Sequence, residues 1–167
     1  MKNNIAVLLF FFSPLVYLTQ FASAQTEQES LRWYKWNEGI EKAYYSKKFA
    51  LIYFFKARIN QIQQMDAGAF ADPTVQELLE KYFIPIRFDA QSEEIITVGT
   101  EQYTQIEWAK KLGVTQFPTI LVYDEQLQFA ARGNLFEPLE FVQFLKYIQG
   151  RYYTLYSFED YKKNNNQ

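Results

Sequence analysis

The chain has 167 residues, of which 49% are hydrophobic and 19% aromatic, and its formal net charge is −2. This length is typical of one domain, and the apolar share is sufficient for a packed core, which excludes an intrinsically disordered chain. The basic residues are scattered and leave no electrostatic footprint for nucleic acid, so we expect no DNA or RNA partner. Cysteine and histidine are absent, which argues against a transition-metal site, and no phosphate-binding glycine motif is present, so we expect no cofactor.

Residues 1–24 have the pattern of a secretory signal peptide. Lys2 gives a positive start, residues 5–18 are mostly apolar, and Ala22-Ser23-Ala24 forms a small-x-small cleavage site before Gln25. We expect a periplasmic or extracellular product without membrane attachment, in which residues 25–161 form a single domain. The alternative is an uncleaved membrane anchor, but the apolar run is short for a span of about 20 residues. No cysteine follows the cleavage site, which excludes lipidation there.

The first half of the mature chain predicts a helix, a strand and two more helices. Residues 31–47 carry apolar side chains at near-helical spacing, and residues 50–55 form a continuous apolar run rich in β-formers, typical of a central strand covered on both faces. Residues 59–71 are predicted to be helical. Asp72-Pro73 is a start signal for the next helix, whose apolar residues recur at i, i+3, i+4 and i+7 (Val75, Leu78, Leu79 and Tyr82).

The second half predicts three strands and two helices. Residues 84–88 alternate as a strand, but Pro85 cannot donate to a ladder, which indicates an edge strand. Residues 100–112 are predicted to form a helix that ends at Gly113. Residues 119–123 and 127–131 form a predicted hairpin. A last helix is predicted to start at Glu137-Pro138, with an apolar stripe of Leu139, Val142, Leu145 and Ile148. A disordered tail is expected at residues 162–167.

This order of elements is α/β, with a βαβ half followed by a ββα half. The chain also resembles the thioredoxin family over roughly residues 36–161, and within it the periplasmic thioredoxin-related proteins of the sulfur-oxidation-associated type, which also end in a Tyr-rich segment such as residues 152–161. The resemblance implies a thioredoxin-like fold with a central mixed sheet of about four strands flanked by helices. It rests on the order and spacing of Phe54-Phe55, Met65-Asp66, Asp72-Pro73, Phe88-Asp89, Phe117-Pro118-Thr119, Gly133 and Glu140-Phe141.

The redox site that the resemblance implies is replaced in this chain. In such proteins two cysteines, one turn apart at a helix N-terminus, exchange disulfides, and the corresponding positions here are Ile59 and Ile62. Arg58 stands where a tryptophan often precedes the first cysteine, and Tyr53 stands where some thioredoxins place a buried acid. Isoleucine is neither nucleophilic nor titratable, so thiol–disulfide oxidoreductase activity is excluded and we predict that the protein is not an enzyme.

The Phe117-Pro118-Thr119 segment is nevertheless retained. The resemblance implies a cis proline and a preceding residue whose backbone pairs with an extended peptide. One hypothesis is a peptide-binding groove at the former active site, made by Arg58, Ile59, Asn60, Gln61, Ile62, Phe117, Pro118 and Thr119. The alternative is that Ile59, Ile62 and Met65 are core residues at i, i+3 and i+6, and that Pro118 only serves the fold.

Two classes of function follow from a thioredoxin-like chain without cysteine. The first is a non-catalytic module, a chaperone or adaptor, that binds an exported protein or peptide in the cell envelope. The second is a structural subunit of an envelope or secretion complex that uses the fold as a scaffold.

Overall fold

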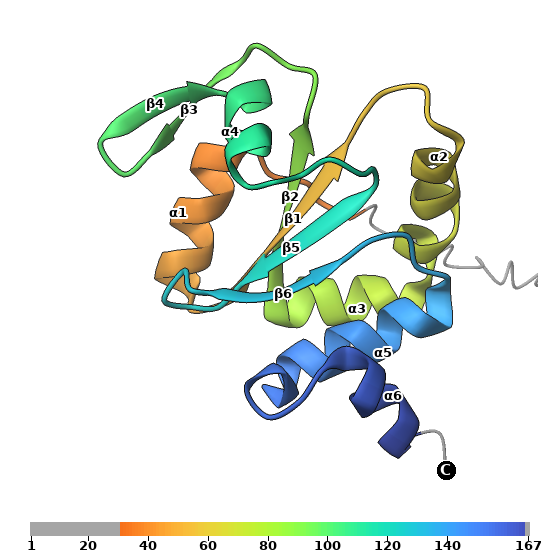
Figure 1. Cartoon of the computed structure of the whole chain (residues 1–167). Coiled ribbons are helices and arrows are strands. Elements are labelled where there is room, and N and C mark those ends of the chain that lie inside the picture. Colours follow the sequence, from red (N-terminus) through yellow and green to blue (C-terminus); the bar gives the residue numbers. More distant parts are fainter. Residues whose placement is uncertain (1–30, 166–167) are drawn as a thin grey trace, which may run out of the picture.

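Four strands form one mixed sheet at the centre of the fold, in the order β2-β1-β5-β6 (Figure 1). In this computed structural model, which describes residues 31–165, β1 (Phe49–Phe55) pairs in parallel with β2 (Phe83–Asp89). On its other side β1 pairs antiparallel with β5 (Thr119–Tyr123), and β5 pairs antiparallel with β6 (Phe129–Gly133). The predicted α/β class and the predicted central position of β1 are confirmed. The expected signal peptide lies outside the described residues.

Helices cover both faces of this sheet (Figure 1). One face packs against α1 (Trp36–Ser46) and α4 (Gln105–Lys111). The other packs against α2 (Asn60–Ala67), α3 (Pro73–Tyr82) and α5 (Pro138–Gln149), with the short 3₁₀ turns η1 (Ala69–Ala71) and η2 (Tyr152–Thr154). Side chains of β1 alternate between the two resulting cores, which explains its unbroken apolar sequence.

The segment before α1 differs from its prediction. Residues 31–35 are not helical, and Tyr34 instead forms an isolated parallel bridge with Ile86 on the free side of β2. The Tyr34 N–H donates to Pro85 O at 2.9 Å, and the Arg87 N–H donates to Tyr34 O at 3.0 Å. Pairing at the sheet edge therefore overrides the near-helical spacing of this segment. Among the named strands β2 lies at an edge of the sheet, as Pro85 predicted.

The predicted helix at residues 100–112 begins later than expected. Residues 101–104 are strand β4 (Glu101–Thr104), which forms a hairpin with β3 (Ile95–Val98). Thr104 is the N-cap of α4: its Oγ1 accepts from the Glu107 N–H, and the Glu107 carboxylate accepts from the Thr104 N–H. This capping box fixes the helix start after Thr104. The predicted helix at residues 59–71 is likewise interrupted at Gly68, where α2 ends and η1 follows.

Other helix signals are confirmed with local changes. The Asp72 carboxylate caps α3 by accepting from the N–H groups of Thr74 and Val75 at 2.9 and 3.0 Å. In α5 the predicted apolar stripe is buried at Leu145 and Ile148, but Leu139 at its start is 73% exposed. The buried face also includes Phe141, Phe144 and Tyr147.

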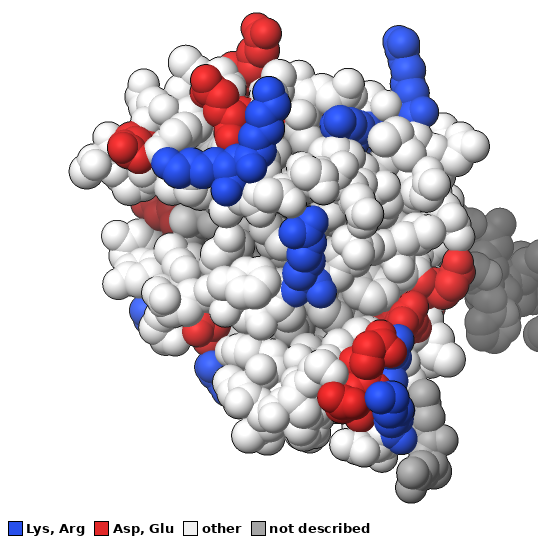
Figure 2. Space-filling model, viewed as in Figure 1, with Lys and Arg blue, Asp and Glu red and all other residues white. Residues whose placement is uncertain are grey.

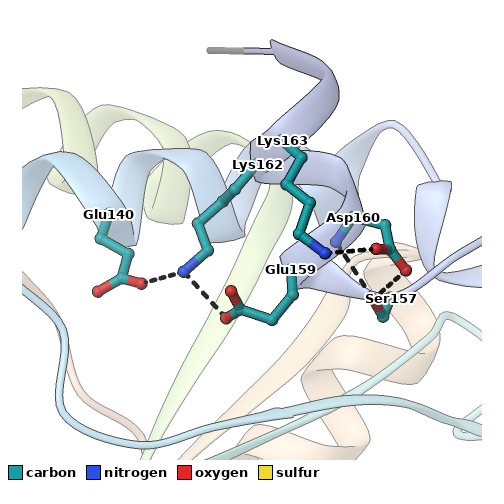
Figure 3. Close-up of polar contacts among 6 residues, drawn as sticks. All are labelled: Glu140, Ser157, Glu159, Asp160, Lys162 and Lys163. Atoms are coloured by element: carbon teal, nitrogen blue, oxygen red, sulfur yellow. Dashed lines mark hydrogen bonds and ion pairs between the residues drawn. The ribbon is translucent and has the colours of Figure 1, made fainter.

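The chain end forms α6 (Phe158–Asn165), so residues 162–165 are helical where the sequence predicted a disordered tail (Figure 3). Lys162 joins α6 to α5, since its Nζ lies 2.6 Å from Glu140 Oε1 and 3.0 Å from Glu159 Oε1. Ser157 Oγ donates to Asp160 Oδ2 and accepts from the Asp160 N–H, which caps the start of α6. The Glu140–Lys162 pair has no local sequence signature, whereas the three-residue spacing of Ser157 and Asp160 was a signal for a helix start that the sequence analysis missed.

Candidate functional site

The turn between β1 and α2 and the loop before β5 lie side by side. Their adjacency follows from the sheet register, because Phe54 near the end of β1 pairs with Thr119 at the start of β5. The Phe117–Pro118 peptide bond is cis, as the resemblance implied. The Nζ of Lys56 lies 4.5 Å from the centroid of the Phe117 ring, a cation–π contact that joins the two loops directly.

The residues of the candidate groove are buried to very different degrees. Arg58, Asn60 and Gln61 are exposed, and Ile59 and Phe117 are half-buried. The remaining three, Ile62, Pro118 and Thr119, are buried. The accessible surface is therefore two half-buried apolar side chains flanked by polar ones, while Ile62 belongs to the core that α2, α3 and α5 share.

The loop that carries Phe117 is anchored by the Thr119 side chain. Thr119 Oγ1 donates to Gln116 O at 2.8 Å and lies 3.3 Å from Asn134 Oδ1, so this hydroxyl faces the interior. Phe117 is held differently: among residues 31–165, neither its backbone N–H nor its backbone carbonyl takes part in a hydrogen bond. Free backbone groups beside a sheet are what an added extended strand pairs with.

The start of α2 has no side-chain cap. Ile59 occupies the N-cap position with φ −104° and ψ 128°, and an aliphatic side chain cannot accept from the first amides of the helix. The preceding Arg58 has φ 66°, a left-handed conformation that is uncommon for a side chain other than glycine. Lys56 and Arg58 give this loop its positive charge, and Figure 2 shows basic side chains near the start of α2, whereas charges of both signs are mixed over α6.

A polar cluster that the sequence analysis missed lies in the core behind these loops. Arg87 on β2 pairs with Asp66 on α2, with 2.6 Å between Nη2 and Oδ2, and both side chains are about one-third exposed. The Arg87 guanidinium also lies 4.7 Å from the Phe55 ring centroid and 5.8 Å from that of Tyr53. The available sequence signal was the alternation of β2, which puts Arg87 on the opposite face from Ile86; the register that pairs Arg87 with Tyr53 comes from the structure.

Tyr53 carries an unpartnered hydroxyl into this cluster. Its side chain is fully buried, and neither its hydroxyl nor Asp66 Oδ1 has a hydrogen-bond partner among the described residues. Burial raises the pKa of Tyr53, the Asp66 charge raises it further, and Arg87 opposes the shift. At the position of the buried acid that the resemblance implied, this protein therefore holds a neutral phenol.

Replacing Tyr53 by phenylalanine is expected to raise the free energy of unfolding by about 1 kcal/mol, because a buried donor without an acceptor costs its full desolvation. Urea unfolding of the wild type and of Tyr53→Phe measures the difference. Tyr123→Phe is a control, since Tyr123 is only half-buried and is absent from the buried unpartnered groups. A loss of stability in Tyr53→Phe would show that the hydroxyl has a partner beyond the described residues.

The groups present at the site exclude thiol chemistry. The full sequence has no cysteine, so the chain has no thiol for disulfide exchange. Residues 31–165 contain no group of three carboxylates placed to hold a metal ion. In the same part of the chain, no helix combines the length and the apolar character needed to cross a bilayer.

A mixed sheet with helices on both faces and a cis-Pro loop beside the start of α2 defines the thioredoxin-like fold. Residues 36–149 match the family model described as a thioredoxin-like domain, so the chain belongs to that family. No curated protein sequence matches it.

Solved structures with the same fold are distant in sequence. A thioredoxin from Thermus thermophilus superposes with a TM-score of 0.59 at 23% identity, covering 72% of this chain and 88% of that one. A structure titled DsbH oxidoreductase superposes with a TM-score of 0.57 at 13% identity, covering 76% of this chain and 87% of that one. A putative disulphide-isomerase from Bacteroides thetaiotaomicron superposes with a TM-score of 0.53 at 19% identity, covering 73% of this chain and 91% of that one. At these identities the likeness shows the fold alone.

Proposed function

We propose that this chain is an exported, non-catalytic thioredoxin-like protein that binds an extended segment of a partner protein at Phe117. The observation that carries the proposal is the free backbone N–H and carbonyl of Phe117, beside the half-buried side chains of Phe117 and Ile59. Main-chain hydrogen bonds give such strand addition its affinity, and adjacent apolar side chains give it selectivity. The absence of cysteine supports a binding role, because it removes the disulfide chemistry of the fold from this surface.

Export and subgroup are part of the same proposal. The charged start, apolar run and Ala-Ser-Ala site within residues 1–24 support secretion into the periplasm or out of the cell. The Tyr-rich residues 152–161 support the subgroup of periplasmic thioredoxin-related proteins associated with sulfur oxidation. The partner is then an exported protein or peptide.

Site-specific photo-crosslinking in cells that express the full chain tests this proposal. A benzophenone amino acid placed at position 117 is expected to trap a partner of defined mass. The same amino acid at Tyr45 should not, because Tyr45 is 73% exposed near the end of α1, close to where β1 begins and away from Phe117. Ile59→Asp should lower the yield of adduct at position 117 by roughly tenfold or more, since it removes an apolar anchor.

The pattern of adducts separates the outcomes. Several partners at position 117 indicate a chaperone-like binder, and one stoichiometric partner indicates the alternative role of a structural subunit. Equal trapping at positions 117 and 45, or an adduct unaffected by Ile59→Asp in a folded variant, contradicts binding at this site.

A further inference from the structure

A second surface feature lies on the other face of the sheet, under the β3–β4 hairpin. It is a pocket of about 200 Å³ between α1, α4, the hairpin and the turn after β5. Its lining is mostly apolar and contains no Asp, Glu, Lys or Arg. The six large side chains in this lining are Trp36, Ile40, Val98, Trp108, Tyr123 and Leu127.

The aromatic walls of this pocket are fixed in place. Trp36 Nε1 donates to Thr97 O at 3.0 Å, and the Thr97 N–H donates to Asn37 Oδ1 at 3.0 Å, so α1 holds the hairpin at two points. The Trp108 ring lies edge-to-face with Trp36 at 5.9 Å between centroids, and Tyr103 packs against Trp108 at 5.1 Å. The walls are therefore formed before any ligand arrives, which reduces the entropic cost of binding.

A glycine at the turn of the β3–β4 hairpin belongs to the lining of the pocket. Gly99 turns the hairpin with φ +62°, and a Cβ added there would meet no atom within 4 Å. A two-residue turn with positive φ favours glycine, so the backbone conformation accounts for Gly99 at this position. Tyr123 is the one titratable group in the lining, and burial raises its pKa, so the pocket stays neutral at physiological pH.

We propose that this pocket binds a free, neutral, one-ring aromatic molecule with a small substituent. The volume sets the size, because an apolar cavity of about 150 Å³ holds benzene, whereas drug-sized ligands need roughly 300–1,000 Å³. Two indole rings in edge-to-face contact form a corner that offers a face and an edge to a ring lying against both, an arrangement that aromatic pairs prefer. The absence of lining charges selects against ions, whose desolvation would be uncompensated.

The three indole N–H signals of the full mature chain in a ¹H–¹⁵N spectrum provide the test, with p-cresol as the probe. We expect saturable shifts of the Trp36 and Trp108 signals with a Kd of about 1 mM or tighter. The Trp33 signal should not move, because its ring packs on Tyr53 and Phe70 in the opposite core. 4-Methylcyclohexanol should bind about tenfold more weakly because it lacks the ring interactions.

Two pocket-filling variants and a matched control complete the experiment. Val98→Phe, and Ile40→Phe from the opposite wall, should each weaken p-cresol binding at least about tenfold, while Ile95→Phe should leave it unchanged because Ile95 is 60% exposed on the same strand. Dispersed indole signals show that each variant is folded. Non-saturable shifts, an equal shift of Trp33, or unchanged binding in both folded filling variants would overturn the proposal. Equal affinity for N-acetyl-phenylalanine amide would also overturn it, by indicating a peptide side chain as the occupant.

Discussion

Phe144→Ala is expected to lower the free energy of unfolding by about 3–5 kcal/mol, whereas Leu139→Ala on the same helix should change it by less than about 0.5 kcal/mol. The Phe144 side chain is fully buried, while that of Leu139 is 73% exposed. Phe144 packs between the loop before α5 and the start of α6, because its ring lies 4.8 Å from that of Phe136 and 5.2 Å from that of Phe158 between centroids. Truncation therefore leaves a cavity bounded by α5, α6 and the loop before α5.

The loss of stability in Phe144→Ala should extend to α6. Phe158 also packs on Tyr147, and Tyr161 packs on Tyr147 and Tyr152, so α6 depends on the same aromatic cluster. Chemical denaturation followed by tryptophan fluorescence gives the two free energies, and amide hydrogen exchange in α6 reports whether it loosens. A small effect of Phe144→Ala, or a large effect of Leu139→Ala, would show that α5 packs through a different face than the one that carries Phe144.

The face of α5 shows why its orientation was not predictable from spacing alone. Leu139, Val142, Leu145 and Ile148 follow a helical apolar stripe, but Phe141, Phe144 and Tyr147 form another beside it. The buried face of the helix takes residues from both stripes, because Leu145 and Ile148 are buried together with Phe141, Phe144 and Tyr147 while Leu139 stays exposed. By contrast, β1 and the Asp72 cap have strong local signals, and both were predicted correctly.

Some features of the candidate site were predicted and others were not. The place of Ile59, Ile62 and Pro118 was implied by the resemblance to the thioredoxin family, and the structure brings the two loops together. The ion pair of Asp66 with Arg87 needs the parallel register of β1 and β2 and the rotation of α2, neither of which a single sequence specifies. The pocket under the β3–β4 hairpin was also missed, since β4 was assigned to a helix and β3 to no element.

Introducing cysteines by Ile59→Cys and Ile62→Cys together is expected to create a reversible disulfide in a chain that has none. The two positions are one turn apart, with the Ile62 N–H donating to Ile59 O at 3.0 Å, and residues three apart on a helix lie within about 5–6 Å between Cβ atoms. Position 59 is half-buried at the N-terminus of α2, near Lys56 and Arg58, whereas Ile62 is only 6% exposed. A thiol at position 59 should therefore have a pKa below its usual value.

The surroundings predict unequal thiols and slow turnover in this variant. At pH 7 alkylation of Cys at position 59 should be about tenfold faster than at position 62, because only the first is accessible and stabilised as a thiolate. Tyr53 is a neutral phenol, and burial, the first cause of its raised pKa, keeps it from accepting the proton of a thiol at position 62. Mass spectrometry after equilibration with oxidised glutathione gives the disulfide yield, and insulin reduction gives turnover. The control is Ile59→Ser with Ile62→Ser, which should show neither. If the folded double-cysteine variant forms no 59–62 disulfide, the turn lacks the geometry of a thiol site. The proposed binding at Phe117 would then rest on its free backbone groups alone and not on a likeness to a redox site.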